Sequence, residues 1–275
     1  MASQPVIVQR QGRLAIITLN APERLNAINA QMGALLDKAF AETGADPQIR
    51  AIMITGAGRS FCAGASMDRL DEVRGDRTRL GGSDPAVFDA FDNAPEQLRT
   101  RYTIPMAIPK PVIAAVNGAC AGAGLVLALA CDIRIASPQA KFIASFARMG
   151  LIAEGPMAYL LPRIIGFGRA SDMLLSGRPV DADEALSWGL ASRLLTSDDF
   201  LEEASAAAAI LAETVSPRST RFIKVQLLDA LSDVLTRSID HATQGVREAL
   251  MWPDLVEGIS AFREKRLPAF PDAGI

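Results

Sequence analysis

Two glycine-containing stretches have the residue types best suited to stabilising a negative charge. Residues 62–66 read C-A-G-A-S, and residues 118–124 read G-A-C-A-G-A-G. A loop of small residues before a helix can aim free backbone N–H groups at a developing oxyanion. Each stretch could therefore supply one donor. The alternative use of such residues is the close packing of helices and strands, which also requires small side chains.

Other common catalytic groups are scarce. The only histidine is His241, in a polar helical stretch, so a multi-histidine metal centre is excluded. The segment around Ser66 lacks the second glycine of the G-x-S-x-G motif, which disfavours a hydrolase that uses Ser66 and His241 as catalytic residues. The three cysteines, Cys62, Cys120 and Cys131, form no CxxC pair. This cysteine usage argues against a disulfide framework or a cysteine zinc site and indicates a reducing compartment.

Phosphate-binding motifs and basic surfaces are not found in the sequence. There is no G-x-x-x-x-G-K-[ST], and Gly118, Gly122 and Gly124 do not have the spacing of G-x-G-x-x-G, so hydride transfer is unsupported. The chain has 28 Lys and Arg against 31 Asp and Glu, a net charge of -3, without a long cationic run. We therefore expect no nucleic-acid partner.

The chain gives no signal for export or membrane insertion. Its N-terminus lacks the basic and apolar segments of a secretory signal, which predicts a cytoplasmic protein. Residues 111–131 are uncharged over about the length of a bilayer core. Asn117 and several glycines interrupt this run, which fits a buried strand followed by a buried helix. We expect no membrane partner.

The surrounding pattern predicts the elements that position the glycine loops. A hairpin of strands at residues 7–9 and 14–19 precedes a helix over 28–43. The strand predicted at 51–55 does not alternate, which indicates burial on both faces. A strand at 112–116, a helix at 122–130 and a strand at 133–136 repeat the order strand, glycine loop, helix, which indicates an α/β core. Residues 68–101 are charged and predict a mobile flap around Gly81 and Gly82.

After residue 196 the periodicity is helical. Ser197 to Asp199 could cap a helix that runs to Ala212, and Pro217 could open the next one. A third helix is predicted over 236–251. The apolar stripes of this region must be buried against the core or against another subunit. We divide the chain into a core at 1–196 and a helical region at 197–275.

Motifs along nearly the whole chain resemble those of the crotonase superfamily, the enoyl-CoA hydratase/isomerase family. They are F-C-A-G-A-S at 61–66, P-K-P-V-I-A-A-V-N-G at 109–118, C-D-I-R-I-A at 131–136, L-P-R-I-I-G at 161–166, L-S-G at 175–177, A-L-S-W-G-L at 185–190 and F-R-E-K-R at 262–266. The resemblance implies a spiral of repeated ββα units over 1–196 that holds the CoA and acyl site. It also implies that region 197–275 builds a homotrimer or a dimer of trimers.

The resemblance further implies an acyl-CoA thioester whose carbonyl oxygen is held by the backbone N–H groups of Ala65 and Ala123. Coenzyme A is then part of the substrate, and no cofactor or metal is expected. The family's hydratases use two glutamates, and the matching positions here are Val126 and Phe146, neither of which can move a proton. We expect both in the acyl pocket with Ser66, which stands where relatives carry aspartate.

One acid lies at a position that the resemblance marks as catalytic. Glu154 falls where several isomerase-type members carry an aspartate or glutamate. A single carboxylate beside an oxyanion hole is sufficient to move a double bond. Apolar neighbours should raise its pKa by desolvation. The alternative is that Glu154 caps the helix that begins near Pro156.

The resemblance also assigns contacts to coenzyme A at both ends of the chain. The alternative for these residues is that the cations are solvated and the phenylalanine belongs to the core. The expected CoA-binding residues are Arg24, Leu25, Arg59 and Ala63, with Phe262 and Lys265 reaching the CoA of a neighbouring subunit.

The favoured reaction is Δ3,Δ2-isomerisation of an enoyl-CoA by Glu154. One alternative is an enoyl-CoA hydratase of fatty-acid β-oxidation, in which Glu154 activates water alone. Another is a non-catalytic acyl-CoA-binding or assembly subunit, which the loss of acids at Val126 and Phe146 would explain. RNA binding, known for some members of the superfamily, is disfavoured by the acidic balance.

Overall fold

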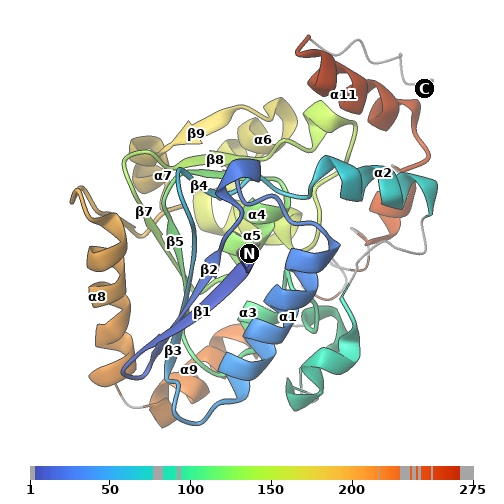
Figure 1. The fold of residues 1–275 in the computed structure, drawn as a ribbon. Helices are drawn as coiled ribbons and strands as arrows, with labels where there is room; N and C mark the ends of the chain where they lie inside the picture. The colour runs from blue at the N-terminus through green and yellow to red at the C-terminus, as the bar shows by residue number, and fades with distance from the viewer. Residues whose placement is uncertain are drawn as a thin grey trace.

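The computed structural model describes residues 4–76, 83–91, 94–215, 217–229, 236, 240, 243–248 and 250–266. Two sheets form its centre (Figure 1). The larger sheet has the order β1-β2-β3-β5-β7-β10 and the smaller one the order β4-β6-β8-β9. The larger sheet contains β1 (Val6–Gln11), β2 (Leu14–Leu19), β3 (Ala51–Gly56), β5 (Val112–Val116), β7 (Ile133–Ala136) and β10 (Arg193–Leu194). The smaller sheet contains β4 (Ser60–Cys62), β6 (Ala119–Ala121), β8 (Lys141–Ile143) and β9 (Pro179–Asp181).

From β3 to β8, consecutive strands alternate between the two sheets, which confirms the ββα repeat. β3, β5 and β7 lie parallel in the larger sheet, and the strand after each of them lies in the smaller sheet. β4 and β6 are parallel neighbours there, and β6 and β8 are parallel as well. α2 (Met67–Gly75) follows β4, and α4 (Ala123–Ala130) follows β6. Two successive units therefore present the same edge of the smaller sheet to the start of a helix.

The predicted hairpin and first helix are both present. β1 and β2 pair antiparallel with Gln11 opposite Leu14. The short 3₁₀ helix η1 (Pro22–Arg24) leads to α1 (Ala30–Ala45), two residues later than predicted. α1 begins there because the side chain of Asn29 accepts a hydrogen bond from Met32 N at 2.8 Å. This is an ordinary N-cap, so the boundary was predictable from Asn29 itself.

The larger sheet is covered on both faces, as the non-alternating strand predicts. Ile52 and Ile54 of β3 belong to the main core, together with α1 and α4. Ala51 and Met53 of the same strand instead pack in a second cluster that includes alanines of α8 (Phe200–Glu213). Figure 1 shows α8 along the opposite side of the sheet from α1. The small residues Ala204, Ala208 and Ala212 let this helix approach the strands closely.

The remaining helices complete the shell. α8 is capped by Asp199, and α9 (Pro217–Asp229) opens with proline, both as predicted. Whether region 197–275 builds an oligomer stays a prediction. The helix predicted over 236–251 lies partly, and Gly81, Gly82 and His241 lie wholly, outside the described residues. The other helical elements are η3 (Pro85–Phe91), η4 (Glu96–Leu98), α3 (Ile104–Ala107), η5 (Ala147–Met149), α5 (Met157–Ile165), α6 (Phe167–Ser176), α7 (Ala182–Trp188) and α11 (Pro253–Glu264).

Candidate active site

The two glycine loops lie against each other. β4 and β6 are parallel neighbours with Cys62 opposite Cys120, so the loops that leave their ends meet at one edge of the smaller sheet. Gly64 has φ +103°, and a Cβ there would lie 3.0 Å from Ala121 O and 3.5 Å from Ala123 N. A Cβ at Gly124 would lie 2.4 Å from Cys62 O. Both glycines are therefore required for the close approach of the two loops. The small residues that allow this packing lie in the same loops as the candidate backbone N–H donors.

The backbone N–H groups of Ala65 and Ala123 are the free donors of these loops. Ile28 N donates to Gly64 O at 2.7 Å and Ser66 N donates to Ile28 O at 3.0 Å, so the backbone is bridged on each side of Ala65. No backbone oxygen of the described residues accepts from Ala65 N. Ala123 is the first residue of α4, where an N–H has no intrahelical partner, and no side chain caps this helix. Both residues line one cavity of about 200 Å³.

Glu154 lines the same cavity. Its side chain is half-buried, and burial raises the pKa of this carboxyl to about 7. The N-cap residue of α5 is Pro156, and no side chain caps that helix. Only the backbone carbonyl of Glu154 accepts from Met157 N, at 3.2 Å. The carboxyl is therefore not used as a helix cap and faces the cavity.

The three residues expected in the acyl pocket have different surroundings. Val126 lines the cavity, and a Cβ at Gly155 would lie 3.1 Å from its Cγ1, so the segment that carries Glu154 packs on α4. Ser66 uses its hydroxyl to cap α2, accepting from Arg69 N at 3.2 Å, and does not line the cavity. Phe146 precedes η5 and is buried in the main core, also away from the cavity lining.

Further cavity-lining residues escaped the sequence analysis. One continuous segment, residues 97–103, contributes most of the polar lining, and α2 and the C-terminal region contribute apolar side chains. No periodicity marks residues 97–103, which form a 3₁₀ turn and a loop. These additional lining residues are Arg69, Leu70 and Val73 of α2, Gln97, Thr100, Arg101, Tyr102 and Thr103 of the segment, Ile28, Asn29 and Leu151 of nearby loops, and Thr243, Val246 and Leu250.

A buried ion pair fixes the position of this segment. Arg101 donates from Nε and Nη2 to the two carboxylate oxygens of Asp37 on α1, at 2.9 and 2.6 Å. The two side chains are 5% and 3% exposed. Burial raises the pKa of Asp37, and the hydrogen bond and charge of Arg101 oppose that shift. A bidentate pair of this kind is geometrically specific, so it sets where residues 97–103 lie against α1.

Two asparagines, the buried Asn26 and the half-buried Asn117, hold the loops near Arg24 and Arg59. Asn26 has φ +56° and donates from Nδ2 to Ala57 O at 2.9 Å and to Ser60 O at 2.7 Å. Asn117 Nδ2 donates to Gly56 O at 2.8 Å and to Gly58 O at 2.9 Å. Together they satisfy carbonyls of the turn between β3 and β4, which carries Arg59.

The expected CoA-binding residues lie in two separate places. One is the region around η1 and β4, and the other is the end of α11. Ala63 N donates to Leu25 O at 3.0 Å, which ties the η1 segment to the loop after β4. Arg24 and Arg59 are exposed. Phe262, 63% exposed, and Lys265 lie at the end of α11 and do not line the cavity. Their contact with the CoA of a neighbouring subunit stays a prediction.

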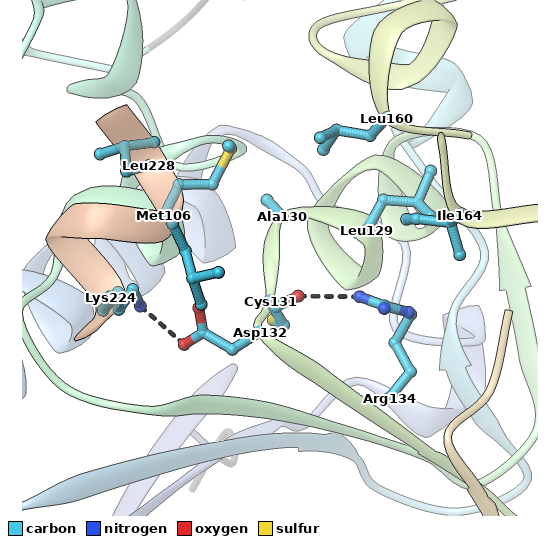
Figure 2. A pocket seen from close by; sticks show the side chains of 11 residues that line it. Met106, Leu129, Ala130, Cys131, Asp132, Arg134, Leu160, Ile164, Lys224 and Leu228 are labelled. Carbon is cyan, nitrogen blue, oxygen red and sulfur yellow. Dashed lines mark hydrogen bonds and ion pairs between the residues drawn. The ribbon is translucent and has the colours of Figure 1, made fainter. Parts of the chain in front are cut away.

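A second cavity, of about 180 Å³, lies at the opposite end of α4 (Figure 2). Lys224 of α9 donates to Asp132 Oδ2 at 2.7 Å and to Pro105 O at 2.6 Å. Arg134 donates to Cys131 O at 2.8 Å and to Leu190 O at 2.8 Å. These contacts neutralise the carboxylate and cap the carbonyl end of α4. The charged groups here are engaged in the fold, so the cavity beside Ala65, Ala123 and Glu154 is the candidate active site.

The described residues contain no group of three or more His, Cys, Asp or Glu side chains that could hold a metal ion. Within the same residues, every helix falls short of the length and apolar character needed to cross a membrane.

Comparison with known proteins gives the family. The profile of the Enoyl-CoA hydratase/isomerase family matches residues 9–273. A 1,2-epoxyphenylacetyl-CoA isomerase of Escherichia coli is 36% identical over 255 residues, which are 92% of this chain and 93% of that protein. A probable enoyl-CoA hydratase of Mycobacterium leprae is 34% identical over 270 residues, covering 98% of this chain and 99% of that protein.

Solved structures of proteins named as CoA-ester hydratases have the same fold. The crystal structure of an enoyl-CoA hydratase from Mycobacterium avium subsp. paratuberculosis matches with a TM-score of 0.82 at 29% identity, over 98% of this chain and 99% of that one. A carnitinyl-CoA hydratase from Mycobacterium avium matches with a TM-score of 0.81 at 30% identity, over 98% and 99% of the two chains. The shared fold is the two-sheet spiral described above. The chain is a member of the enoyl-CoA hydratase/isomerase, or crotonase, family of enzymes.

Proposed function

We propose that this protein moves the double bond of a 3-enoyl-CoA to the 2-position, with Glu154 as the acid/base. The observation that carries the proposal is a single carboxyl in a cavity that also holds two free backbone N–H groups. Glu154 is the only Asp or Glu among the described residues that line this cavity. One carboxyl is enough for a transfer in which the proton that leaves one carbon is returned to another.

The reaction would begin with the thioester oxygen held by the N–H groups of Ala65 and Ala123. Those hydrogen bonds, and the positive end of α4, stabilise the charge that develops on the oxygen. The Glu154 carboxylate then takes a proton from the carbon next to the carbonyl, which leaves a dienolate. The same carboxyl, now protonated, returns the proton to the carbon two positions further along the chain, and the carbonyl re-forms.

The electrostatics of Glu154 suit both halves of this transfer. A carboxyl whose pKa is about 7 is a stronger base than an ordinary glutamate and is still partly ionised at neutral pH. Desolvation is the cause of the shift, since no cation is paired with this side chain in the described residues. The apolar neighbours Val126 and Leu151 also limit the access of water to an enolate.

The relatives support neighbouring chemistries as alternatives. Their names include hydratases and an epoxyphenylacetyl-CoA isomerase, all of them acting on CoA esters. Hydration would require Glu154 to activate water alone, because Val126 and Phe146 occupy the positions of the two family glutamates. A non-catalytic acyl-CoA-binding subunit is the third alternative. We propose a homotrimer or a dimer of trimers as the assembly.

The test is the incubation of the purified protein with 3-hexenoyl-CoA and, separately, with 2-hexenoyl-CoA, followed by chromatography and mass determination. The proposal predicts 2-hexenoyl-CoA, of unchanged mass, from the 3-enoyl ester. Glu154→Gln should abolish this conversion and still bind the ester, whereas Glu203→Gln, an exposed carboxyl on α8, should behave as the wild type. A product heavier by one water would establish hydration, and binding without turnover would establish the non-catalytic alternative.

A further inference from the structure

The cavity beside Glu154 has two unlike walls. Residues 97–103 contribute polar side chains to one wall, including Thr100, Tyr102 and Thr103. The lining from α2, α4 and the C-terminal region is mostly apolar, with Leu70, Val126 and Val246 among its residues. A purely hydrocarbon acyl chain would match the apolar wall and leave the polar one without partners. A polar side chain of this wall that has no hydrogen-bond partner within the fold therefore indicates which polar group the acyl chain should carry.

Most polar groups of that wall are already engaged. Thr103 Oγ1 donates a hydrogen bond to the Gln97 carbonyl oxygen at 3.0 Å. The hydroxyls of Thr100 and Thr103 are hydrogen-bonded to each other at 2.8 Å. Arg101 is held by the two carboxylate oxygens of Asp37. These groups have partners within the fold and have little need of a ligand.

The phenol of Tyr102 is the exception. The Cζ atom of the Arg101 guanidinium lies 5.9 Å from the centre of the Tyr102 ring, which places a cation beside the ring. Tyr102 lines the cavity, and its hydroxyl has one proton to donate. No acceptor for that proton is found among the described residues. Burial raises the pKa of Tyr102, so the phenol keeps its proton at neutral pH.

Three charged side chains from different elements line the cavity together with Tyr102. Arg101 lies next to it in the chain, Arg69 comes from α2, and Glu154 comes from the loop before α5. Glu154 is close enough to raise the pKa of Tyr102 further, yet no hydrogen bond joins the two side chains in the described structure. Both side chains line the same cavity, so a substrate bound there can contact the carboxyl and the phenol together.

We propose that Tyr102 is a specificity-determining residue, whose hydroxyl donates a hydrogen bond to an oxygen that the acyl chain carries a few carbons beyond the thioester. The preferred substrates are then oxygen-bearing acyl-CoA esters, such as oxo or ether derivatives, over plain hydrocarbon chains of equal length. This inference deepens the proposed function by naming the acyl class and rests on it for the use of a CoA ester. The Asp37–Arg101 pair positions the phenol, because it fixes the preceding residue in the chain and the guanidinium beside the Tyr102 ring.

The test compares the binding of hexanoyl-CoA, 4-oxohexanoyl-CoA and 5-oxohexanoyl-CoA by isothermal titration calorimetry. The wild type should bind one of the oxo esters about tenfold more tightly than hexanoyl-CoA, the ratio expected of one satisfied hydrogen bond. Tyr102→Phe should bind all three esters equally, with hexanoyl-CoA bound as in the wild type. Tyr159→Phe is the matched control, because Tyr159 of α5 is the only other tyrosine and does not line the cavity. It should keep the preference.

Three results would overturn the inference. They are a wild type without a preference for either oxo ester, a preference that survives in Tyr102→Phe, and a Tyr102→Phe variant that no longer binds hexanoyl-CoA, which would make Tyr102 a structural residue. None of the three esters contains the double bond on which isomerisation acts. A failure of the proposed isomerase activity would instead be seen as absent turnover of 3-hexenoyl-CoA by the wild type, whatever the binding preference.

Discussion

The activity of this protein should follow the ionisation of Glu154. Burial raises the pKa of this carboxyl from its ordinary value of 4.5 to about 7. Only the carboxylate can take a proton from the substrate. Between pH 6 and pH 8 the ionised fraction of such a group rises from about one tenth to about nine tenths. Since kcat/KM reports the free enzyme, its value for 3-hexenoyl-CoA should rise about tenfold over that range.

The assay is the rate of 2-hexenoyl-CoA formation from pH 5 to pH 9 at constant ionic strength, with ester concentrations well below KM. Glu154→Gln should lose about 10²–10⁴ in kcat/KM and show no such rise with pH, because it has no group to ionise there. Glu203→Gln should reproduce the wild-type curve. A wild-type profile that is already flat above pH 6 would refute the reasoning, since the reacting carboxyl would then have an ordinary pKa and could not be desolvated as the structure shows.

Three further predictions concern the groups around the site. Because the native state holds a proton on Glu154 up to a pKa of about 7 and the unfolded state releases it near 4.5, wild-type stability should fall as the pH rises between these values. In urea unfolding at pH 8, the free energy of unfolding of Glu154→Gln should therefore exceed that of the wild type by roughly 2–3 kcal/mol. Near pH 4 the two proteins should have equal free energies of unfolding. Gly124→Ala, whose Cβ would lie 2.4 Å from Cys62 O, should lower kcat/KM by about 10²–10³, as expected when an oxyanion donor is displaced. Gly75→Ala, which meets nothing within 4 Å, should leave the rate unchanged. Asp37→Asn leaves the Arg101 charge buried without its counter-ion and should cost about 3 kcal/mol in urea unfolding, whereas a loss close to that of an exposed pair, about 0.5 kcal/mol, would show that the pair is dispensable.

The two glycine loops could be identified from the sequence as candidate donor sites, because the pattern that marks them is local. Small residues at 62–66 and 118–124, each after an apolar strand, are enough to indicate backbone donors. The parallel pairing of β4 with β6, which brings Gly64 and Ala123 together, joins residues about 60 positions apart and follows only from the fold. The position of Glu154 was likewise indicated by resemblance, while its orientation into the cavity, in place of capping α5, depends on how the loop before α5 packs on α4.

The polar wall was not predictable, because long-range contacts place it. Arg101 is 64 residues from Asp37, and nothing in either segment marks the two as partners. Tyr102 follows Arg101 into the cavity as a consequence of that pair. Val246 and Leu250 line the cavity from the C-terminal region through a small cluster with Val73 of α2, which no local pattern specifies. Phe146 shows the converse: its position in the family pattern indicated the pocket, yet the turn into η5 directs it into the core.

The central claim is that one carboxyl carries a proton from one carbon of the acyl chain to another. Its most direct test is the conversion of 3-hexenoyl-CoA labelled with deuterium at the carbon next to the thioester, with the product characterised by NMR and mass spectrometry after single turnovers in ordinary water. The account predicts 2-hexenoyl-CoA in which part of the deuterium has moved to the fourth carbon, because the carboxyl that removes the deuterium also returns it. A product in which water has been added across the double bond, or intact labelled ester recovered from a protein that binds it, would contradict the claim.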